Sequence, residues 1–173
     1  MIEVRRADLP QDQAGIAALD TAVATTSILA ATVEADGVRL TSVPRVLTKR
    51  FPLEDLDAAE RPWDRAWVAT GAGRIVGFAA TGFQNWNRRL VLWHFYVDGP
   101  ARGQGIGRDL MEAVREEARR LGARHIWLET SNQNPSGVAV YQALGFSLTG
   151  LDLTLYDATP SEGEFALFLS RTV

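Results

Sequence analysis

The chain has 173 residues, a length typical of one domain with a single hydrophobic core, and we expect residues 1–173 to form one domain. A formal net charge of −3 without a basic block gives no electrostatic case for nucleic-acid binding, and no apolar run approaches the length of a membrane span. The absence of cysteine excludes disulfides, thiolate metal sites and a cysteine nucleophile. Because the N-terminus also lacks the long apolar core of a signal peptide, we expect a cytoplasmic protein.

The first part of the chain predicts strands around one helix. Residues 2–7 alternate in the manner of an edge strand, and residues 38–43 alternate again. Pro10 introduces a helical pattern whose apolar members, near one face, are Ile16, Ala17, Leu19 and Ala22. The charged stretch 51–63 carries two prolines and is interpreted as an exposed loop or a short helix.

A hairpin and a further strand are predicted next. Residues 66–70 and 74–83 have the pattern of two strands joined by Gly71-Ala72-Gly73. Residues 85–88 then predict a turn, and residues 89–97 predict the strand that follows it.

The second half of the chain alternates helices and strands. Apolar residues recur at helical spacing from Arg108 to Leu121, and Gly122 is the expected end of that helix. The remaining predicted elements are a strand over 125–130, a helix over 135–144, and strands near 147–155 and 164–170. An antiparallel first half followed by a β-loop-α-β-α second half predicts an α+β fold.

A glycine-rich run lies between the strand that ends at Val97 and the helix after it. It reads Arg102-Gly103-Gln104-Gly105-Ile106-Gly107. A glycine-rich turn that opens a helix directs free backbone N–H groups and the positive end of the helix dipole at one small region. Such a region suits a pyrophosphate, because no Cβ blocks the approach of backbone to phosphate.

The spacing of these glycines excludes two kinds of phosphate-binding turn. A P-loop requires Gly-Lys-Ser/Thr before its helix, but Lys49 is the only lysine of the chain. A Rossmann turn reads G-x-G-x-x-G, whereas the glycines here stand at Gly103, Gly105 and Gly107. For these six residues alone, a tight loop before an ordinary surface helix is the alternative.

A second motif lies further along the chain, from Asn134 to Phe146. Tyr141 stands seven residues after Asn134, and Gly145-Phe146 stand eleven and twelve residues after it. With Arg102-x-x-Gly105-x-Gly107 before it, this motif resembles the coenzyme site of the GNAT superfamily of N-acetyltransferases. The resemblance implies the GNAT fold, with a mixed central sheet of about six to seven strands flanked by helices.

Segments outside the coenzyme site resemble the streptothricin (nourseothricin) acetyltransferases within that superfamily. They are Ala18-Leu-Asp20, Leu47-Thr-Lys49, Phe51-Pro52, Asn85 to Leu90, His125 to Glu129, Gly150 to Asp152, Leu155 to Asp157 and Glu164 to Ser170. The matches extend over nearly the whole chain. The resemblance therefore implies an acetyl-CoA-dependent N-acetyltransferase with a streptothricin-type antibiotic as the favoured acceptor.

The superfamily resemblance implies how acetyl-CoA is bound. The coenzyme lies between two splayed parallel strands, here about Trp93–Val97 and His125–Thr130. The residues implied in binding it are Phe95, Tyr96, Val97, Arg102, Gly103, Gln104, Gly105, Ile106, Gly107, Arg108, Asn134 and Tyr141. Asn134 contacts the pantetheine or orders the loop, and Tyr141 offers a proton to the departing thiolate. No metal is implied.

The general base is left open by the sequence. An amine near pH 7 is mostly ammonium and must lose a proton before it attacks. GNAT enzymes often carry a glutamate on the strand before the glycine loop, but here residues 92–97 contain no carboxylate, a departure from the streptothricin enzymes too. His94 is the titratable residue there, and Glu129 and Asp152 are its competitors. Without a cysteine, we expect direct attack by the amine in a ternary complex.

The acceptor pocket of a streptothricin enzyme should combine carboxylates with aromatic walls, because the substrate is cationic. The candidates are Asp20, Trp86, Trp93, Asp152, Tyr156 and Asp157, with Glu164 as a further carboxylate. Another small amine, a polyamine-like metabolite or a protein amine is the alternative acceptor, and a non-catalytic CoA-binding module is the alternative to an enzyme. Exposed aromatic residues on terminal strands could support a homodimer.

Overall fold

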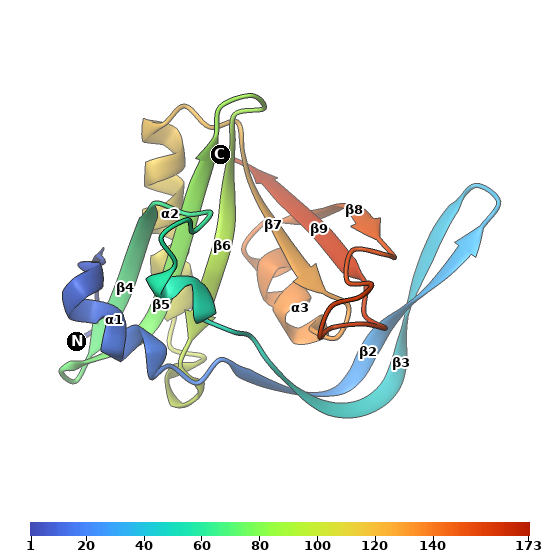
Figure 1. Cartoon of the computed structure of the whole chain (residues 1–173), viewed down its shortest axis with the longest axis horizontal. Helices are drawn as coiled ribbons and strands as arrows, with labels where there is room; N and C mark the ends of the chain where they lie inside the picture. The colour runs from blue at the N-terminus through green and yellow to red at the C-terminus, as the bar shows by residue number, and fades with distance from the viewer. The chain divides into compact units, whose positions relative to one another are not determined.

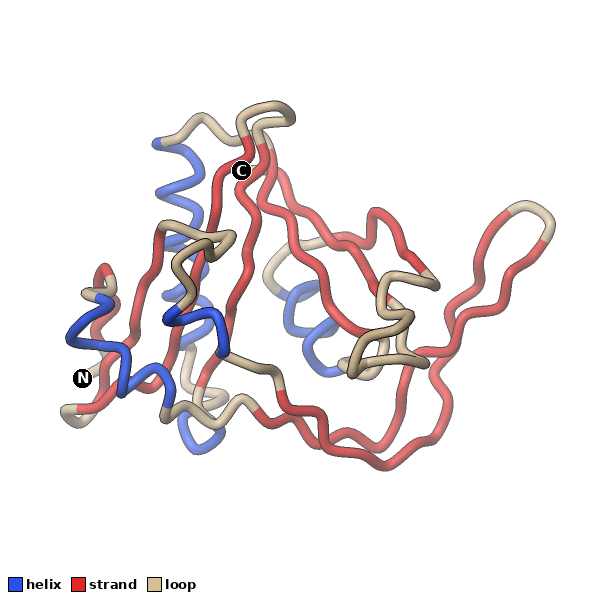
Figure 2. Tube along the Cα trace, viewed as in Figure 1, coloured by secondary structure: helices blue, strands red, loops and turns tan.

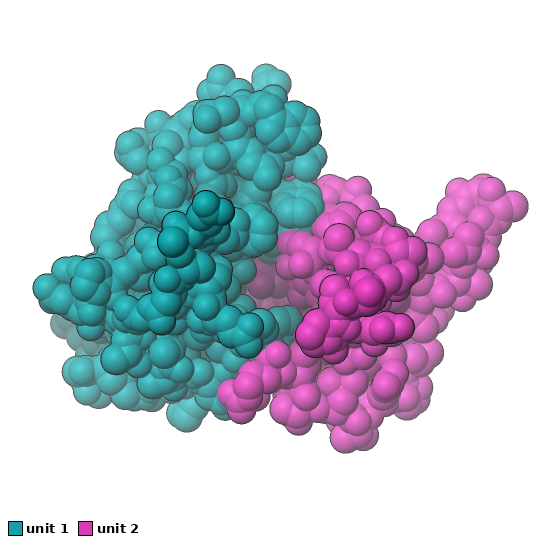
Figure 3. Space-filling model, in the orientation of Figure 1, with its two compact units in different colours: residues 1–21, 51–128, 171–173 teal, residues 22–50, 129–170 magenta.

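The computed structural model describes residues 1–173, which divide into two compact units (Figure 3). Unit 1 contains residues 1–21, 51–128 and 171–173 and is teal in Figure 3, and unit 2 contains residues 22–50 and 129–170 and is magenta. None of the helices has the length and hydrophobicity that a membrane crossing would need.

Unit 1 is built on a mostly antiparallel sheet (Figure 1). Its antiparallel strands are, in spatial order, β1 (Glu3–Arg6), β4 (Arg65–Gly71), β5 (Arg74–Gln84) and β6 (Arg89–Val97). Strand β7 (His125–Ser131) starts parallel to β6, in a register that runs from Arg89↔His125 to Val91↔Trp127. The parallel pair that the resemblance implies is thus present at the start of both strands.

Helices cover both faces of this sheet. Helix α1 (Leu9–Ala17) and the short 3-10 helix η1 (Glu54–Asp57) lie on one face, where Phe78 and Ala80 of β5 are fully buried. Helix α2 (Ile106–Arg120) packs on the other face, across β4, β5 and β6 (Figure 1). A Cβ at Gly77 of β5 would lie 3.0 Å from Leu110 of α2, so glycine there permits close packing of the helix on the strand.

The predicted hairpin of β4 and β5 is confirmed, and its turn explains its register. Ala72 and Gly73 have φ angles of 50° and 76°, both left-handed. Two consecutive left-handed residues form the hairpin turn that matches the twist of the flanking strands. The pairing Gly71↔Arg74 closes the hairpin around them.

Unit 2 combines a two-stranded ribbon with the chain's last helix and strands. Strands β2 (Ala22–Glu34) and β3 (Gly37–Arg50) pair along their whole length, as Figure 2 shows. Helix α3 (Pro135–Ala143) precedes the antiparallel pair β8 (Ser147–Asp152) and β9 (Ala166–Thr172). The order of the seven-stranded sheet is β1-β4-β5-β6-β7-β9-β8, which confirms the predicted α+β fold with a mixed sheet.

The β2–β3 ribbon corrects the prediction for the first part of the chain. Helix α1 ends at Ala17, and Ala22, expected on its apolar face, is the first residue of β2. Residues 38–43 form only part of β3, which continues to Arg50. The buried Ile16 and Leu19 do pack into one core, but Leu19 does so from the turn after the helix.

Smaller corrections concern the ends of other elements. Helix α2 begins two residues earlier than expected, at Ile106, directly after the glycine run. Strand β8 ends at Asp152, and Leu153 to Leu155 lie in a bend and turn. The strand expected over 89–97 is confirmed at both ends.

Candidate active site

The glycine run of unit 1 forms a turn that opens helix α2. Gly103 and Gly105 have left-handed φ angles of 78° and 87°, which favour glycine. Gly105 is the N-cap, and no side chain caps the helix start. The first N–H groups of a helix have no acceptor within it, although here the Arg108 N–H donates to the Gly105 carbonyl at 2.9 Å. Apart from the adjoining residues, nothing lies within 4 Å of where a Cβ at Gly103 or Gly105 would stand. This open, uncapped turn fits a pyrophosphate.

The side chain of Arg102 holds this turn in place. Its Nε donates a hydrogen bond to the Val97 carbonyl at 3.0 Å, and its Nη2 donates to the Asp20 carbonyl at 3.2 Å. The Asp20 N–H in turn donates to Oδ1 of the buried Asp98 at 3.0 Å. The guanidinium therefore braces the loop against the end of β6, and Asp20 contributes to this brace through its main chain.

The residues predicted on β6 differ in their accessibility. Phe95, Tyr96 and Val97 are half-buried. The start of α2 lies against the Phe95 ring, since a Cβ at Gly107 would stand 3.7 Å from that ring. Trp93 is 44% exposed. These residues lie on the part of β6 that leads into the glycine run.

Trp86 lies apart from that region. It is 85% exposed in the turn before β6, at the opposite end of the strand from the glycine run. Nine residues of strand span on the order of 25–30 Å. The structure therefore does not bring Trp86 to the glycine run.

His94 lies in the core of unit 1, with both ring nitrogens engaged. Its Nε2 is 2.9 Å from Oδ2 of Asp55, and its Nδ1 is 3.3 Å from the Tyr96 hydroxyl. Its ring is 5.9 Å from Trp63 and 5.8 Å from Phe78, and the residue is only 8% exposed. This environment is that of a buried structural histidine and not that of a base open to substrate.

The partner of His94 lies in a stretch expected to be an exposed loop or short helix. Residues 54–57 do form the 3-10 helix η1, but Leu56 and the nearby Trp63 are buried. Trp63 Nε1 donates to Asp55 Oδ2 at 2.6 Å. Burial raises the pKa of Asp55, but the hydrogen bonds from His94 and Trp63 outweigh it and leave that pKa below its ordinary value.

Replacing Asp55 by alanine is therefore expected to destabilise the protein. The change leaves His94 and Trp63 without their acceptor, a loss of about 1–3 kcal/mol in the free energy of unfolding. Because the pKa of folded Asp55 is lowered, its contribution is present above about pH 4 and is lost as the pH falls through the lowered pKa. Urea unfolding of both proteins at neutral and acidic pH measures this difference.

Asp64→Ala is the matched control. Its carboxylate is 64% exposed and pairs with Arg65, so its removal should change the unfolding free energy by less than about 1 kcal/mol. Equal effects of the two substitutions at neutral pH would contradict a structural role for the His94–Asp55 pair.

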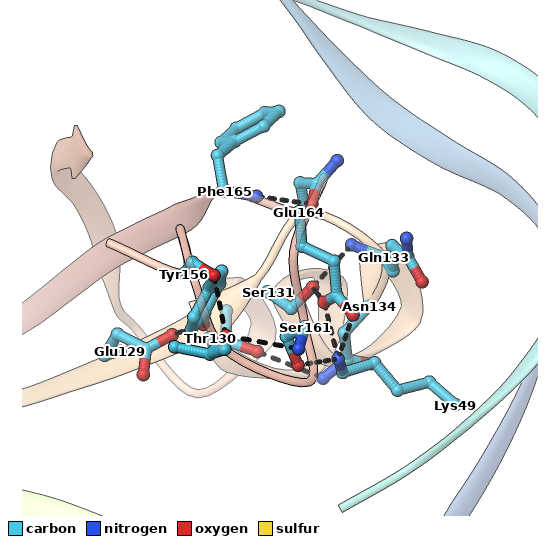
Figure 4. A network of polar contacts seen from close by, with 12 residues as sticks. Lys49, Glu129, Thr130, Ser131, Gln133, Asn134, Tyr156, Ser161, Glu164 and Phe165 are labelled. Atoms are coloured by element: carbon cyan, nitrogen blue, oxygen red, sulfur yellow. Dashed lines mark hydrogen bonds and ion pairs between the residues drawn. The ribbon is translucent and has the colours of Figure 1, made fainter. Parts of the chain in front are cut away.

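In unit 2, two predicted residues meet at a hydrogen bond. The Tyr156 hydroxyl donates to Oε1 of Glu129, which stands on β7 (Figure 4). Glu129 is reached by solvent but crowded by protein atoms, so loss of hydration raises its pKa above the ordinary value. The Tyr156 hydrogen bond and the Lys49 charge oppose this rise, and the Glu164 charge adds to it.

Tyr141 stands in the last turn of α3, as predicted. Its half-buried ring packs edge-on against Phe146, at 5.8 Å between centroids, and Gly145 between them has a left-handed φ of 88°. Burial raises the pKa of Tyr141, and the negative charge of Glu129 raises it further. The phenol is therefore held in its protonated form, with a carboxylate close enough to act on it.

Asn134 orders the loop between β7 and α3. Its Oδ1 accepts a hydrogen bond from the Gly137 N–H at 3.0 Å, and its Nδ2 donates to Thr130 Oγ1 at 3.2 Å. Asparagine is a preferred N-cap, and this one is only 6% exposed. Asn134 is thus the N-cap of α3, and its contact with the pantetheine stays a prediction.

Asp152 and Asp157 belong to turns of the segment after β8. Asp152 Oδ1 accepts hydrogen bonds from the N–H and hydroxyl of Thr154, at 2.8 and 2.9 Å, which lower the pKa of the Asp152 carboxyl. Asp157 is exposed, and its N–H donates to the Thr154 carbonyl at 3.0 Å. Their local structure is that of turn-forming residues.

One feature beside this site was not assigned from the sequence. Lys49 of β3 forms an ion pair with Glu164, and Glu164 also accepts a hydrogen bond from Ser131 of β7 (Figure 4). The available signal was that Lys49 is the single lysine among 18 basic residues. No three His, Cys, Asp or Glu side chains come together in a way that could hold a metal ion.

Comparison with known families decides the relationship that the two motifs indicate. Residues 37–146 match the model of the Acetyltransferase (GNAT) family, a span that contains both motifs. The chain belongs to the GNAT family. It is therefore an acetyl-CoA-dependent N-acetyltransferase, and the predicted superfamily resemblance is confirmed.

Among GNAT proteins, the chain is similar to a streptothricin acetyltransferase and to a nourseothricin acetyltransferase. It is 40% identical to streptothricin acetyltransferase of Streptomyces lavendulae over 174 residues, covering 95% of this chain and 92% of that one. The crystal structure of nourseothricin acetyltransferase is 39% identical, with a TM-score of 0.89 over 99% and 98% of the two chains. A Bacillus anthracis structure, determined with acetyl coenzyme A, has a TM-score of 0.82 over the full length of both chains but is only 21% identical, which shows a shared GNAT fold.

Proposed function

We propose that this GNAT enzyme transfers the acetyl group of acetyl-CoA to a primary amine of a streptothricin-type antibiotic. Similarity to streptothricin acetyltransferase over 95% of the chain supports this acceptor. The structural observation that carries it is the Glu129–Tyr156 pair, which places a carboxylate and an aromatic ring together near Tyr141. A carboxylate beside an aromatic face is what a cationic amine requires.

The glycine run supports binding of the donor substrate. We assign the pyrophosphate to the main-chain amides of residues 103–107, because the Arg102 and Arg108 N–H groups already donate to the Gly99 and Gly105 carbonyls. The Arg102 side chain holds this turn through its hydrogen bonds to the Val97 and Asp20 carbonyls. The main chain of Phe95, Tyr96 and Val97 is assigned to the pantetheine arm, as an added strand would pair. Acetyl-CoA supplies the acetyl group as a thioester; every other function falls to residues of this chain.

Glu129 is the general base in this proposal. An amine substrate arrives as ammonium and must give up a proton before its nitrogen can attack. A carboxylate whose pKa is raised by loss of hydration is a better base near neutral pH than an ordinary glutamate. His94 is buried against Asp55 and Tyr96, and the hydrogen bonds from Thr154 lower the pKa of Asp152, so neither competes as well as Glu129.

Tyr141 is the general acid. Its phenol is kept protonated by burial and by the charge of Glu129, so it holds a proton for the coenzyme sulfur as the thiol leaves. The amine attacks the thioester carbonyl directly, because the chain has no cysteine on which an acetyl group could be held. Neither Glu129 nor Tyr141 becomes acetylated during the reaction.

We extend the proposal to the protein as a whole. Residues 1–173 act as one GNAT domain, located in the cytoplasm, whose partners are small molecules and not nucleic acid or membrane. A homodimer is part of this proposal, and gel filtration with light scattering measures it.

The test of the acceptor is thiol release from acetyl-CoA with streptothricin beside spermidine, lysine and an aminoglycoside. Because the chain has no cysteine, a thiol reagent reads only the released coenzyme. We expect turnover on streptothricin with one acetyl group added to the product mass, and an unmodified enzyme mass after rapid quenching. Turnover on another amine instead would assign a different acceptor to the same chemistry, and an acetylated enzyme would contradict direct attack.

A further inference from the structure

A largely buried ion pair lies next to the proposed base within unit 2. Lys49 Nζ is 2.6 Å from Oε1 and 2.5 Å from Oε2 of Glu164, and 3.5 Å from Ser161 Oγ. The two charged side chains are only 14% and 10% exposed. Figure 4 shows Lys49 approaching Glu164 from β3, while Ser161 and Glu164 belong to the segment that leads into β9. An ion pair on the surface would be far more open to water and would contribute little to the stability of the protein.

This ion pair is linked to the strand that carries Glu129. Ser131 Oγ donates to Glu164 Oε2, and Ser131 Oγ also accepts from the Gln133 N–H at 3.0 Å. Ser131 and Glu129 are two residues apart on β7, so their side chains leave the same face of the strand, about 7 Å apart along it. The Lys49–Glu164 pair therefore stands one strand repeat away from Glu129.

The same segment connects the ion pair to the partner of Glu129. Tyr156, which donates to Glu129, lies a few residues before Ser161 and Glu164 in the stretch between β8 and β9. Lys49 thus ties this stretch to the β2–β3 ribbon. Asn132 also connects the ribbon to the stretch between β8 and β9. Its Nδ2 donates to the Leu29 carbonyl of β2 at 2.8 Å, and its Oδ1 accepts from the Phe165 N–H at 3.0 Å.

We infer that the Lys49–Glu164 ion pair is a positioning element of the acyl-transfer site that balances the charge facing Glu129. This inference rests on the proposed role of Glu129 as base. The ionisable groups of unit 2 that act on Glu129 are Lys49, Glu164, Tyr156 and Tyr141. The Lys49 ammonium favours ionised Glu129 and the Glu164 carboxylate disfavours it, so the two charges of the intact pair act on Glu129 in opposite directions.

The decisive experiment measures the pH at which kcat/KM falls on the acidic side of its profile, here called the acidic limb. It compares one variant that removes a positive charge with one that removes a negative charge. Lys49→Met leaves two neighbouring carboxylates unbalanced, so the limb should move up by about half to one pH unit. Glu164→Gln removes the competing negative charge, so the limb should move down by a similar amount. Lys49→Arg keeps the positive charge and should leave the limb near its wild-type position.

A double variant keeps the test independent of folding defects. Lys49→Met with Glu164→Gln leaves no unpaired buried charge, and its limb should return to near the wild-type position. Arg39→Met is the matched control. Arg39 pairs with Glu34 at 2.7 Å at the tip of the ribbon, where their side chains are 64% and 38% exposed. Loss of this exposed pair should leave the acidic limb of kcat/KM where it is in the wild type.

Glu129→Gln, measured in parallel, separates the two proposals. If the acidic limb persists in Glu129→Gln, the proposed base is wrong. If Glu129→Gln removes the limb but the Lys49 and Glu164 single variants do not shift it in opposite directions, the base stands and the ion pair is merely structural.

Discussion

Replacing Tyr141 by phenylalanine is expected to lower kcat by at least about 100-fold, because general acid catalysis contributes about 10²- to 10⁴-fold. The phenol holds the proton that the departing thiol requires, and burial keeps that proton on the oxygen at neutral pH. The ring itself is retained, so its packing against Phe146 and the stability of the protein should be unchanged. Steady-state kinetics with saturating acetyl-CoA measures kcat directly.

Binding of acetyl-CoA separates a catalytic effect from a structural one. The glycine run that we assign to the pyrophosphate is untouched by Tyr141→Phe, so the dissociation constant for acetyl-CoA should change by less than about threefold. A kcat within about threefold of wild type would remove Tyr141 from the acid role. It would also reopen the alternative of a module that binds CoA without catalysis, for which this hydroxyl is irrelevant.

Replacing Glu129 by glutamine should lower kcat/KM by about 10²- to 10⁴-fold near neutral pH. The base must be ionised to accept a proton, so wild-type kcat/KM should rise with pH through the pKa of Glu129. That pKa lies above its ordinary value because of lost hydration, so the rise should occur at a higher pH than for an exposed glutamate. A pH profile of kcat/KM for both proteins measures the effect, and the limb should be absent from Glu129→Gln.

The deficit of Glu129→Gln should shrink at high pH. Primary amines titrate at about pH 10, so an increasing fraction of the acceptor arrives already deprotonated and needs no base. A deficit that stays constant up to that pH would indicate that Glu129 holds the acceptor and does not accept its proton. His94→Asn is the comparison, because its effect should appear as lost stability and not as a lost limb.

The elements predicted correctly are those whose signal is local. The hairpin of β4 and β5 follows from two strand patterns and a glycine turn, and β6 from nine apolar-rich residues between two turns. The helices predicted after the glycine run and over 135–144 also rest on local patterns, and they correspond to α2 and α3. In each case the deciding residues lie within a few positions of the element that they define.

Strand β2 and the extension of β3 beyond residues 38–43 were missed because their support is not local. Strand β2 is paired with β3 and is held to the rest of unit 2 by Asn132, 103 positions from Leu29. Its sequence mixes alanine with β-branched residues and lacks a clean alternation, so periodicity alone does not distinguish it.

The site was predicted as a set of residues, but not as a set of partners. Glu129 and Tyr156 were both candidates, one for catalysis and one for the acceptor pocket, and the structure joins them by a hydrogen bond. His94 was a reasonable base while its surroundings were not known. In the structure His94 lies in the core and contacts Asp55, a residue 39 positions away in a stretch expected to be an exposed loop or short helix. Partnerships of this kind depend on tertiary structure, which no spacing in one sequence reveals.

The scarcity of lysine has a consequence for an enzyme of this chemistry. An acetyltransferase that uses free amines as nucleophiles is exposed to acetylation of its own side chains. Here 17 of the 18 basic residues are arginines, whose guanidinium groups do not attack thioesters, and the one lysine amine is held against both oxygens of Glu164. A protonated amine in an ion pair has no lone pair to offer. The chain therefore presents almost no lysine target for self-acetylation, however long it remains with its donor.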